Sequence, residues 1–264
     1  MGISHSTARW LAPLSFAVDF AAQTYGMTST PNMKDVHDAN LSFFSPQPYF
    51  IAAFFAPQQI LQMVWLYKLC KKNRQAVDGV ESAGEKDLST MVDFAPYYAL
   101  GNFCIATWMI FWNRSDLKTS NIFVVINSLA QLYYISTQLP PMKLDSANSI
   151  LTHVVAKTFA GIGVLDLLHN GSVAYFNHQT AGPMTKVLTG LGFGALALSS
   201  DWIFGGCLVY DLVALAVGQR AYGNQSWSQW LTLYAGATAA IVGLRNVVKP
   251  PYTREAASGY ETLR

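Results

Sequence analysis

Charged residues are scarce in this sequence, since aspartate, glutamate, lysine and arginine together make up only 12% of its 264 residues. An average soluble domain carries about 25% charged residues, which keep its surface hydrated. Hydrophobic residues reach 52%, and the mean hydropathy is +0.23. The composition therefore favours a membrane protein, and the alternative is a large, unusually apolar soluble helical protein. Lysines and arginines form no stripe, so nucleic acid is not an expected partner.

Cysteines and the common catalytic motifs are equally sparse. Cys70, Cys104 and Cys207 lie far apart and form no CxxC pattern, so neither a disulfide framework nor a zinc site is supported. The sequence has no HExxH, no Ser-His-Asp order and no histidine box. Its last apolar stretch also lacks the lysine that a retinal Schiff base requires. We therefore expect neither a metal nor a cofactor.

What the sequence does contain is a series of long apolar stretches. A helix needs about 20 apolar residues to cross the hydrocarbon core of a bilayer. Prolines at the joints, such as Pro46, Pro48 and Pro140–Pro141, are typical of helix boundaries. The sequence predicts an all-α, polytopic membrane helix bundle with eight transmembrane helices. These are Trp10–Met27, Tyr49–Leu69, Phe94–Trp112, Thr119–Leu139, Ile150–Phe176, Met184–Ser200, Trp202–Gln219 and Trp227–Val248.

The sixth and seventh stretches follow each other without an obvious loop. A single straight helix over Met184–Gln219 would rise about 54 Å, against a hydrocarbon core of about 30 Å. Ser199, Ser200 and Asp201, in the middle of this run, are typical of a helix N-cap. We therefore predict two helices that meet at Asp201, and a seven-span protein with one long helix is the alternative.

The basic residues test this division, because cytoplasmic loops are enriched in lysine and arginine. With eight spans, eleven basic residues share the side of the N-terminus and five lie on the other, whereas seven spans give eight on each side. The eleven are Arg9, Lys68, Lys71, Lys72, Arg74, Lys86, Lys143, Arg245, Lys249, Arg254 and Arg264, and the five are Lys34, Arg114, Lys118, Lys186 and Arg220. Eight spans, with both termini cytoplasmic, are therefore predicted.

N-glycosylation motifs agree with this orientation. The sequons at Asn40, Asn113 and Asn224 all lie on the side predicted to be non-cytoplasmic. We expect a single integral membrane domain over residues 1–264, located in the endomembrane system and most simply in the endoplasmic reticulum. Residues 70–93 are predicted to form a flexible cytoplasmic loop, and residues 251–264 a short cytoplasmic tail.

Several polar residues lie inside the predicted spans, where a charge costs about 2.5–3.5 kcal/mol and normally faces the bundle interior. We interpret Asp19, Gln62, Asp166, His169 and Asp211 as the lining of a central polar cavity. Three of them are carboxylic acids that could donate a proton, and His169 could accept one. The alternative is that these side chains only make hydrogen bonds between helices.

Two further charged residues have structural interpretations. Lys157 either extends toward the headgroups or pairs with an acid from another helix. Asp201 is expected to cap the helix that follows it. Gly190 and Gly194 form a GxxxG pair, which is typical of close helix packing and offers a face for oligomer formation.

Two stretches of the sequence resemble the tryptophan-rich sensory protein/translocator (TspO) family, over about half of the chain. The first is Ser45-Pro46-Gln47-Pro48-Tyr49-Phe50 with Gln62, Trp65 and Tyr67, and the second is Tyr97–Asn102 with Trp108 and Phe111-Trp112. Asn170 falls where the fifth helix of that family has an asparagine. The resemblance implies a helical cavity for porphyrins or sterol-like molecules, with Trp65, Asn102, Trp108 and Asn170 as cavity residues. Three additional helices and several missing tryptophans are departures from the family pattern.

Three hypotheses for function follow. The first is a multi-pass membrane protein that binds or transports a small apolar ligand, whether a lipid, a sterol-like or a porphyrin-like molecule. The second is a membrane enzyme of the cyclase or isomerase type that acts on a terpenoid or lipid, with Asp19, Asp166 or Asp211 as acid and His169 as base. The third is a structural or assembly subunit. In each case the lipid bilayer is a partner.

Overall fold

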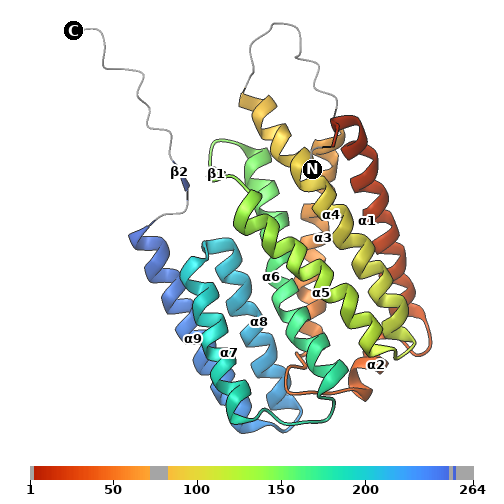
Figure 1. The fold of residues 1–264 in the computed structure, drawn as a ribbon, viewed down its shortest axis with the longest axis vertical. Coiled ribbons are helices and arrows are strands. Elements are labelled where there is room, and N and C mark those ends of the chain that lie inside the picture. The colour runs from red at the N-terminus through yellow and green to blue at the C-terminus, as the bar shows by residue number, and fades with distance from the viewer. Residues whose placement is uncertain (1–2, 72–82, 250–251, 254–264) are drawn as a thin grey trace, which may run out of the picture.

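The computed structural model describes residues 3–71, 83–249 and 252–253, and its fold is all-α (Figure 1). The helices are α1 (His5–Thr28), α2 (Met33–Ala39), α3 (Pro48–Cys70), α4 (Ala83–Asn113), α5 (Leu117–Tyr133), α6 (Ala147–Tyr175), α7 (Pro183–Ser199), α8 (Trp202–Ala221) and α9 (Gln225–Val248). A single π-helical turn, η1 (Tyr134–Gln138), extends α5. The two-residue strands β1 (Met142–Lys143) and β2 (Tyr252–Thr253) pair in parallel.

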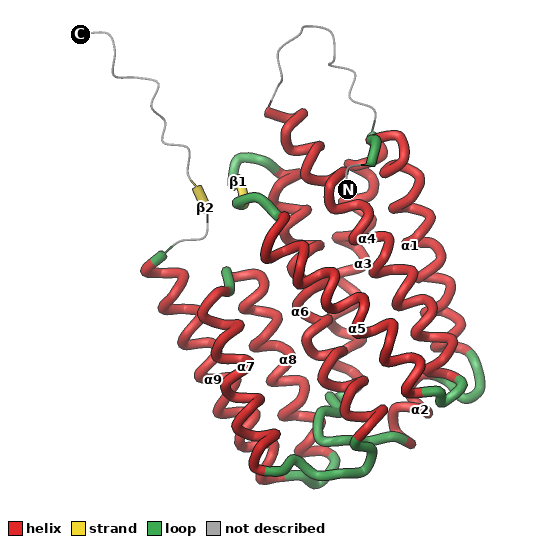
Figure 2. Tube along the Cα trace, viewed as in Figure 1, coloured by secondary structure: helices red, strands yellow, loops and turns green. Residues whose placement is uncertain are grey.

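Within the residues that the structure describes, eight long helices coincide with the eight apolar stretches, and α2 is an additional short helix between α1 and α3 (Figure 2). The predicted division at Asp201 is confirmed, because the Asp201 side chain accepts hydrogen bonds from the backbone N–H groups of Ile203 and Phe204 at the start of α8. Four of the helices, namely α3, α6, α8 and α9, are long and apolar enough to cross a membrane.

Local sequence explains the other helix boundaries in the same way. Ser4 caps α1, Asp116 caps α5 and Ser146 caps α6, each by accepting a hydrogen bond from a backbone N–H in the first turn. The predicted 70–93 loop is partly wrong, because α4 begins at Ala83 and is helical well before Phe94. Hydropathy marks only the apolar part of a helix, so it does not register a polar first turn. The remainder of that loop, like most of the 251–264 tail, lies outside the described residues.

The long helices alternate in direction along the bundle. Figure 1 shows the start of α1 and the end of α9 at the same end of the molecule, which we call the upper end. The end of α3, the start of α4 and the joints between α5 and α6 and between α7 and α8 are also there, whereas α2 and the remaining joints form the lower end. This is the alternation that consecutive membrane crossings require.

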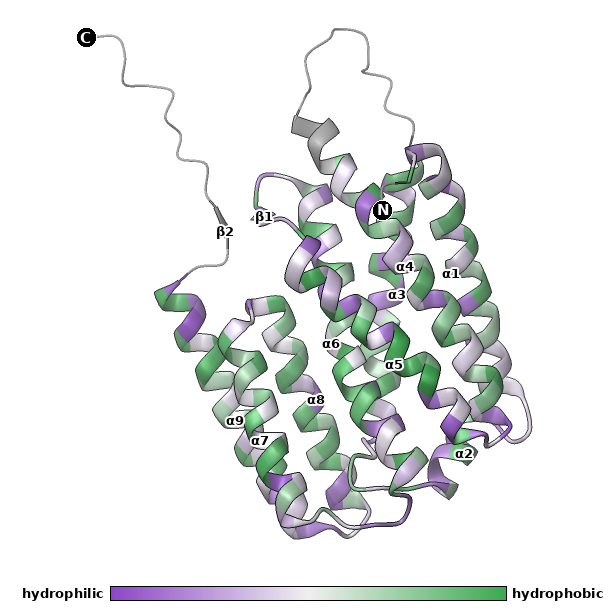
Figure 3. Ribbon diagram, viewed as in Figure 1, coloured by the Kyte–Doolittle hydropathy of each residue, from purple (hydrophilic) through white to green (hydrophobic). Residues whose placement is uncertain are grey.

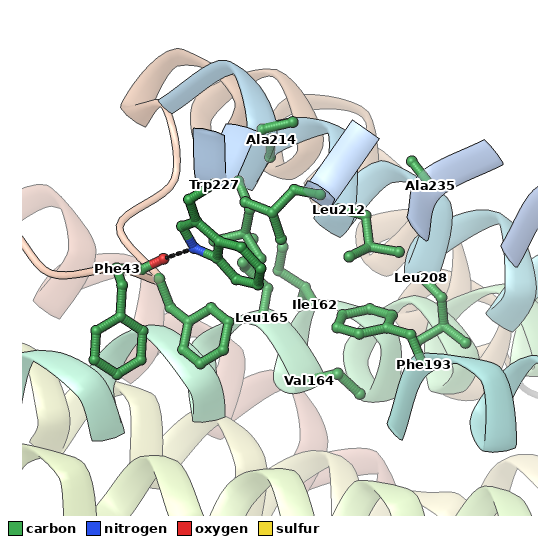
Figure 4. Packing of buried hydrophobic residues seen from close by; sticks show 14 of the residues in the cluster. Phe43, Ile162, Val164, Leu165, Phe193, Leu208, Leu212, Ala214, Trp227 and Ala235 are labelled. Atoms are coloured by element: carbon green, nitrogen blue, oxygen red, sulfur yellow. Dashed lines mark hydrogen bonds between the residues drawn. The ribbon is translucent and has the colours of Figure 1, made fainter. Parts of the chain in front are cut away.

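The core consists of two apolar clusters joined by α6. One cluster packs α1, α3 and α4 against the upper half of α6 around Trp65, Phe94 and Tyr98. The other packs α6, α8 and α9 together and includes Phe43 from the segment before α3. Figure 4 shows this second cluster, in which the Trp227 indole donates a hydrogen bond of 2.6 Å to the Phe43 carbonyl.

Large apolar side chains also cover the outside of the bundle. Leu191 and Leu198 on α7 are each 66% exposed, and Val247 on α9 is 73% exposed. Figure 3 shows the corresponding apolar colouring along α7 and α9. Exposed apolar surface on this scale is costly in water and favourable in a bilayer.

A buried segment connects the two halves at the lower end. Residues 42–46, between α2 and α3, are all buried against the C-terminal helices. The Gln47 N–H donates to the Ala214 carbonyl, and a Cβ on Gly218 would come within 2.5 Å of the Pro46 backbone. Because any side chain at Gly218 would clash with backbone, glycine is what lets this segment enter the bundle.

Candidate functional site

Polar residues follow the contact between α6 and α8, which run in the same direction (Figure 1). Near the upper end, Lys157 of α6 forms an ion pair with Asp201, and the side chains of the two are only 13% and 7% exposed. The sequence left open whether Lys157 pairs with an acid from another helix, and this pairing is confirmed. Asp201 therefore both caps α8 and neutralises a buried ammonium group.

Asp166 and Asp211 lie further down the same contact. Gly161 packs directly on Cys207, so each helix places its aspartate about one turn below this contact. The two carboxyl groups are close enough to interact electrostatically. Asp211 is fully buried, and neither of its oxygens accepts a hydrogen bond from any part of the chain that the structure describes. This arrangement brings together two of the predicted acids.

His169 belongs to a separate network at the lower end. Its Nε2 lies 3.1 Å from Nδ1 of His37, and Nε2 of His37 lies 3.0 Å from the Tyr222 hydroxyl. That hydroxyl donates to the Pro46 carbonyl at 3.0 Å. Since the tyrosine proton is committed to Pro46, a consistent assignment has His37 donating through Nε2 and accepting from His169 through Nδ1. In this assignment His37 is neutral.

His37, which sequence reasoning missed, is buried in the short helix α2. Burial is the main cause that lowers the pKa of His37 to about 4; the charge of Asp38 opposes this shift, and the charge of Lys34 adds to it. Besides these two charges on its own helix, the ring faces His169 from α6 and Tyr222 beyond the end of α8. No local pattern links residues that are 132 positions apart, so only the fold could reveal this pair.

The lowered pKa predicts a loss of stability in acid. Below pH 6.5 the unfolded chain binds a proton at residue 37 and the folded chain does not, until the pH reaches about 4. The contribution of His37 to the free energy of unfolding should fall by about 1.4 kcal/mol per pH unit across this window, or about 3 kcal/mol in all. Thermal unfolding in detergent between pH 7 and 4 measures the slope.

A glutamine at position 37 should flatten that slope, because it cannot take up the proton. The matched control is His178→Gln at the same end of the bundle, where the side chain is exposed to water. The control should keep the slope of the unmodified protein. Equal slopes in His37→Gln and in the unmodified protein would contradict the assignment.

The remaining predicted site residues make specific contacts inside the N-terminal half. Gln62 accepts from the Tyr98 hydroxyl, and the indole N–H of Trp65 donates to Thr152. Asn102 donates to Ser15. These side chains are buried and act as links between helices, as the structural alternative expects.

The last three predicted residues lie in similar surroundings. The Trp108 indole donates to Asn170 at 2.7 Å, so two positions carried over from the family resemblance do meet. Asp19 is buried on α1 and accepts from Gln23 one turn later. A ligand role for any of them stays a prediction.

A pocket of about 650 Å³ opens at the upper end, and we call it the α5–α9 pocket. Its walls come from α5, η1, the 139–142 joint, α6, α7, α8 and α9, and Leu129, Leu139 and Leu196 contribute to its apolar part. The polar part of its lining consists of Ser136, His153, Lys157, Ser199, Ser200, Asp201 and Arg245.

A second pocket, of about 570 Å³, lies at the lower end between α6 and α7. It is mainly apolar and is lined by Phe43, Phe44, Leu168 and Phe176, among others. None of the nine residues predicted to act in catalysis or ligand binding lines either pocket. Sequence reasoning missed Arg245 and His153 as pocket residues, because their pattern matches an ordinary helix end.

The three sequon asparagines all lie at the lower end, in different surroundings. Asn40 and Asn224 are partly buried, whereas Asn113 is buried and its amide nitrogen donates to Ser29 at 2.6 Å. This hydrogen bond would have to break before the Asn113 nitrogen could carry a glycan. Glycosylation at each site stays a prediction.

One of the two glycines of the predicted Gly190/Gly194 face already packs against another helix of the same chain. Gly190 packs against the Tyr234 ring of α9, whose hydroxyl donates to the Lys186 carbonyl. Gly194 has open space beside it. Association between copies through this face stays a prediction.

Comparison with known proteins adds no identification, since no family model, no curated protein and no solved structure matches the chain. The resemblance to the translocator family consequently stays a prediction.

Proposed function

We propose that this chain is an eight-span integral membrane protein of the endomembrane system that binds or transports a small, largely apolar molecule. The alternating directions of the long helices support the eight crossings. The basic residues predicted to be cytoplasmic, among them Arg9, Lys68 and Arg245, belong to the upper ends of their helices, which supports the orientation.

The α5–α9 pocket is the observation that carries the binding function. Its volume of about 650 Å³ lies within the range of about 300–1,000 Å³ that small-molecule sites occupy. Its apolar wall includes Leu129 and Tyr133, which are 56% and 52% exposed on the outside of the bundle. A molecule dissolved in the bilayer could therefore enter from the side without crossing water.

The test is to identify what the purified protein carries. Mass spectrometry of the protein in mild detergent should find a co-purifying apolar molecule, and Leu196→Trp should abolish it by filling the pocket. The matched control is Leu198→Trp on the same helix, where the side chain is 66% exposed and lines neither pocket. Leu139→Trp is a second blocking variant if Leu196→Trp does not elute as a single species. Undiminished ligand in both blocking variants would contradict the proposal.

A membrane enzyme is the second candidate, and the buried carboxyl of Asp211 beside Asp166 favours it. A carboxylic acid without hydrogen-bond partners in an apolar interior is suited to donate a proton. The same mass spectrometry distinguishes the two, because an enzyme would release a converted molecule on incubation and Asp211→Asn would stop that conversion.

A further inference from the structure

The α5–α9 pocket has more positive than negative charge in its lining. Asp201 neutralises Lys157 in a close ion pair. Arg245 donates to the Asn246 amide oxygen at 3.0 Å, and among the described residues no carboxylate lies within ion-pairing distance of it. One cation in the lining is therefore left without an acid to balance it.

His153 supplies a second unused polar group in this pocket. Its ring is 2% exposed, and neither nitrogen meets hydrogen-bonding geometry with any described residue, although the Pro140 carbonyl interacts with the ring. A buried imidazole that lacks partners loses about 1–3 kcal/mol of hydrogen bonding. Both nitrogens are covered, so the ring would have to turn toward the pocket that it lines for a bound acceptor to restore this hydrogen bonding.

The rest of the lining excludes a purely polar ligand. Leu129, Tyr133 and Leu196 form an apolar wall that reaches the outside of α5. A small inorganic anion would leave this wall exposed to water. A molecule with an anionic head and an apolar chain matches both parts of the pocket.

The position of the pocket indicates which membrane leaflet would supply such a molecule. It lies at the upper end, which the excess of basic residues assigns to the cytoplasm. Basic pockets between helices on that side are typical binding sites for the headgroups of anionic lipids. Arginine suits this role, because its planar guanidinium binds phosphate through two hydrogen bonds.

We propose that the α5–α9 pocket binds a phosphate-bearing amphiphile, which deepens, and rests on, the binding function proposed above. Arg245 and His153 hold the phosphate, and Lys157 stays paired with Asp201 beside it. The apolar chain lies along Leu129, Tyr133 and Leu196. Lipid headgroups and free phosphate present the same phosphate group. The contact between the apolar chain of the ligand and the apolar wall of the pocket favours the lipid over free phosphate.

The experiment is native mass spectrometry of the full chain in mixed micelles with phosphatidic acid or diacylglycerol, which has the same acyl chains but no phosphate, repeated with inorganic phosphate as competitor. The unmodified protein should prefer phosphatidic acid by about five- to tenfold, which is the scale of one charge near a membrane surface. Arg245→Gln should remove this preference. Lys249→Gln, at the C-cap that follows α9 and outside the pocket lining, should keep it. His153→Phe is a second variant that should weaken it.

The outcomes separate this inference from the proposed function. Equal binding of both lipids that Leu196→Trp abolishes would overturn the phosphate inference and leave the binding function standing. An equal loss of preference in Lys249→Gln would overturn it too, because the effect would then be one of general surface charge. Displacement of the lipid by micromolar inorganic phosphate would show that the ligand is a soluble anion. If Leu196→Trp removes no bound lipid, both the phosphate inference and the proposed binding function are overturned.

Discussion

Asp201→Ala should be the most destabilising single substitution in the upper half of this protein. It removes two capping hydrogen bonds at the start of α8 and leaves the Lys157 ammonium buried without its acid. Removing one partner of a buried ion pair costs about 3–5 kcal/mol of stability, and losing an N-cap costs about 1 kcal/mol more. Thermal unfolding in detergent, followed by size-exclusion chromatography, measures the loss.

Two companion variants separate the cap from the charge. Asp201→Asn keeps a capping oxygen but not the ion pair, so it should lose about 3–5 kcal/mol. Adding Lys157→Met to Asp201→Asn removes the stranded ammonium and should recover most of that loss. If the double variant is as unstable as Asp201→Asn alone, the ion pair is not what stabilises this region.

Gln219→Leu should have the second-largest effect, at the lower end. The Gln219 side chain is fully buried, and its amide nitrogen donates to the Ser42 and Ser45 carbonyls at 2.9 and 3.0 Å. Its oxygen accepts from Asn224 at 2.8 Å. Leucine would strand the Ser45 carbonyl and the Asn224 amide, at about 1–3 kcal/mol for each buried group. We expect a total loss of about 2–6 kcal/mol.

The change should also release the buried segment before α3. Limited proteolysis should cut Gln219→Leu within residues 41–47 and leave the unmodified protein intact there. Gln225→Leu is the matched control, because Gln225 is exposed at the start of α9. Gln219→Glu should be at least as damaging as leucine, since a carboxylate would face two carbonyl oxygens. Normal stability in Gln219→Leu would show that these bonds do not hold the segment.

Much of the fold could be predicted because its signals are local in the chain. The apolar stretches locate the eight long helices, and the residues around Asp201 locate the break between α7 and α8. Where the local signal was polar, prediction failed. The short helix α2 has a capping box at Asn32 and Asp35 but no apolar stretch, and the first turns of α4 precede Phe94.

The candidate site could be predicted only in part, since a polar residue in a span indicates burial without indicating its neighbour. Asp166 and Asp211 were chosen individually, and the parallel course of α6 and α8 is what places them together. Arg245 was assigned to the cytoplasmic side by its charge. That it lines an open pocket together with His153 depends on how α9 is rotated.

The sequence by itself determined that this chain is a bundle of apolar helices, where the apolar part of each long helix lies, and which end is basic. Hydropathy and capping act within one turn or one span, so they can be read along the chain. Only the tertiary structure decided which helices touch and which polar groups meet, such as His37 with His169 or Gln219 with the 42–45 carbonyls. In a membrane, the buried and lipid-facing sides of a helix are both apolar, so the pattern of residues does not fix how each helix is rotated.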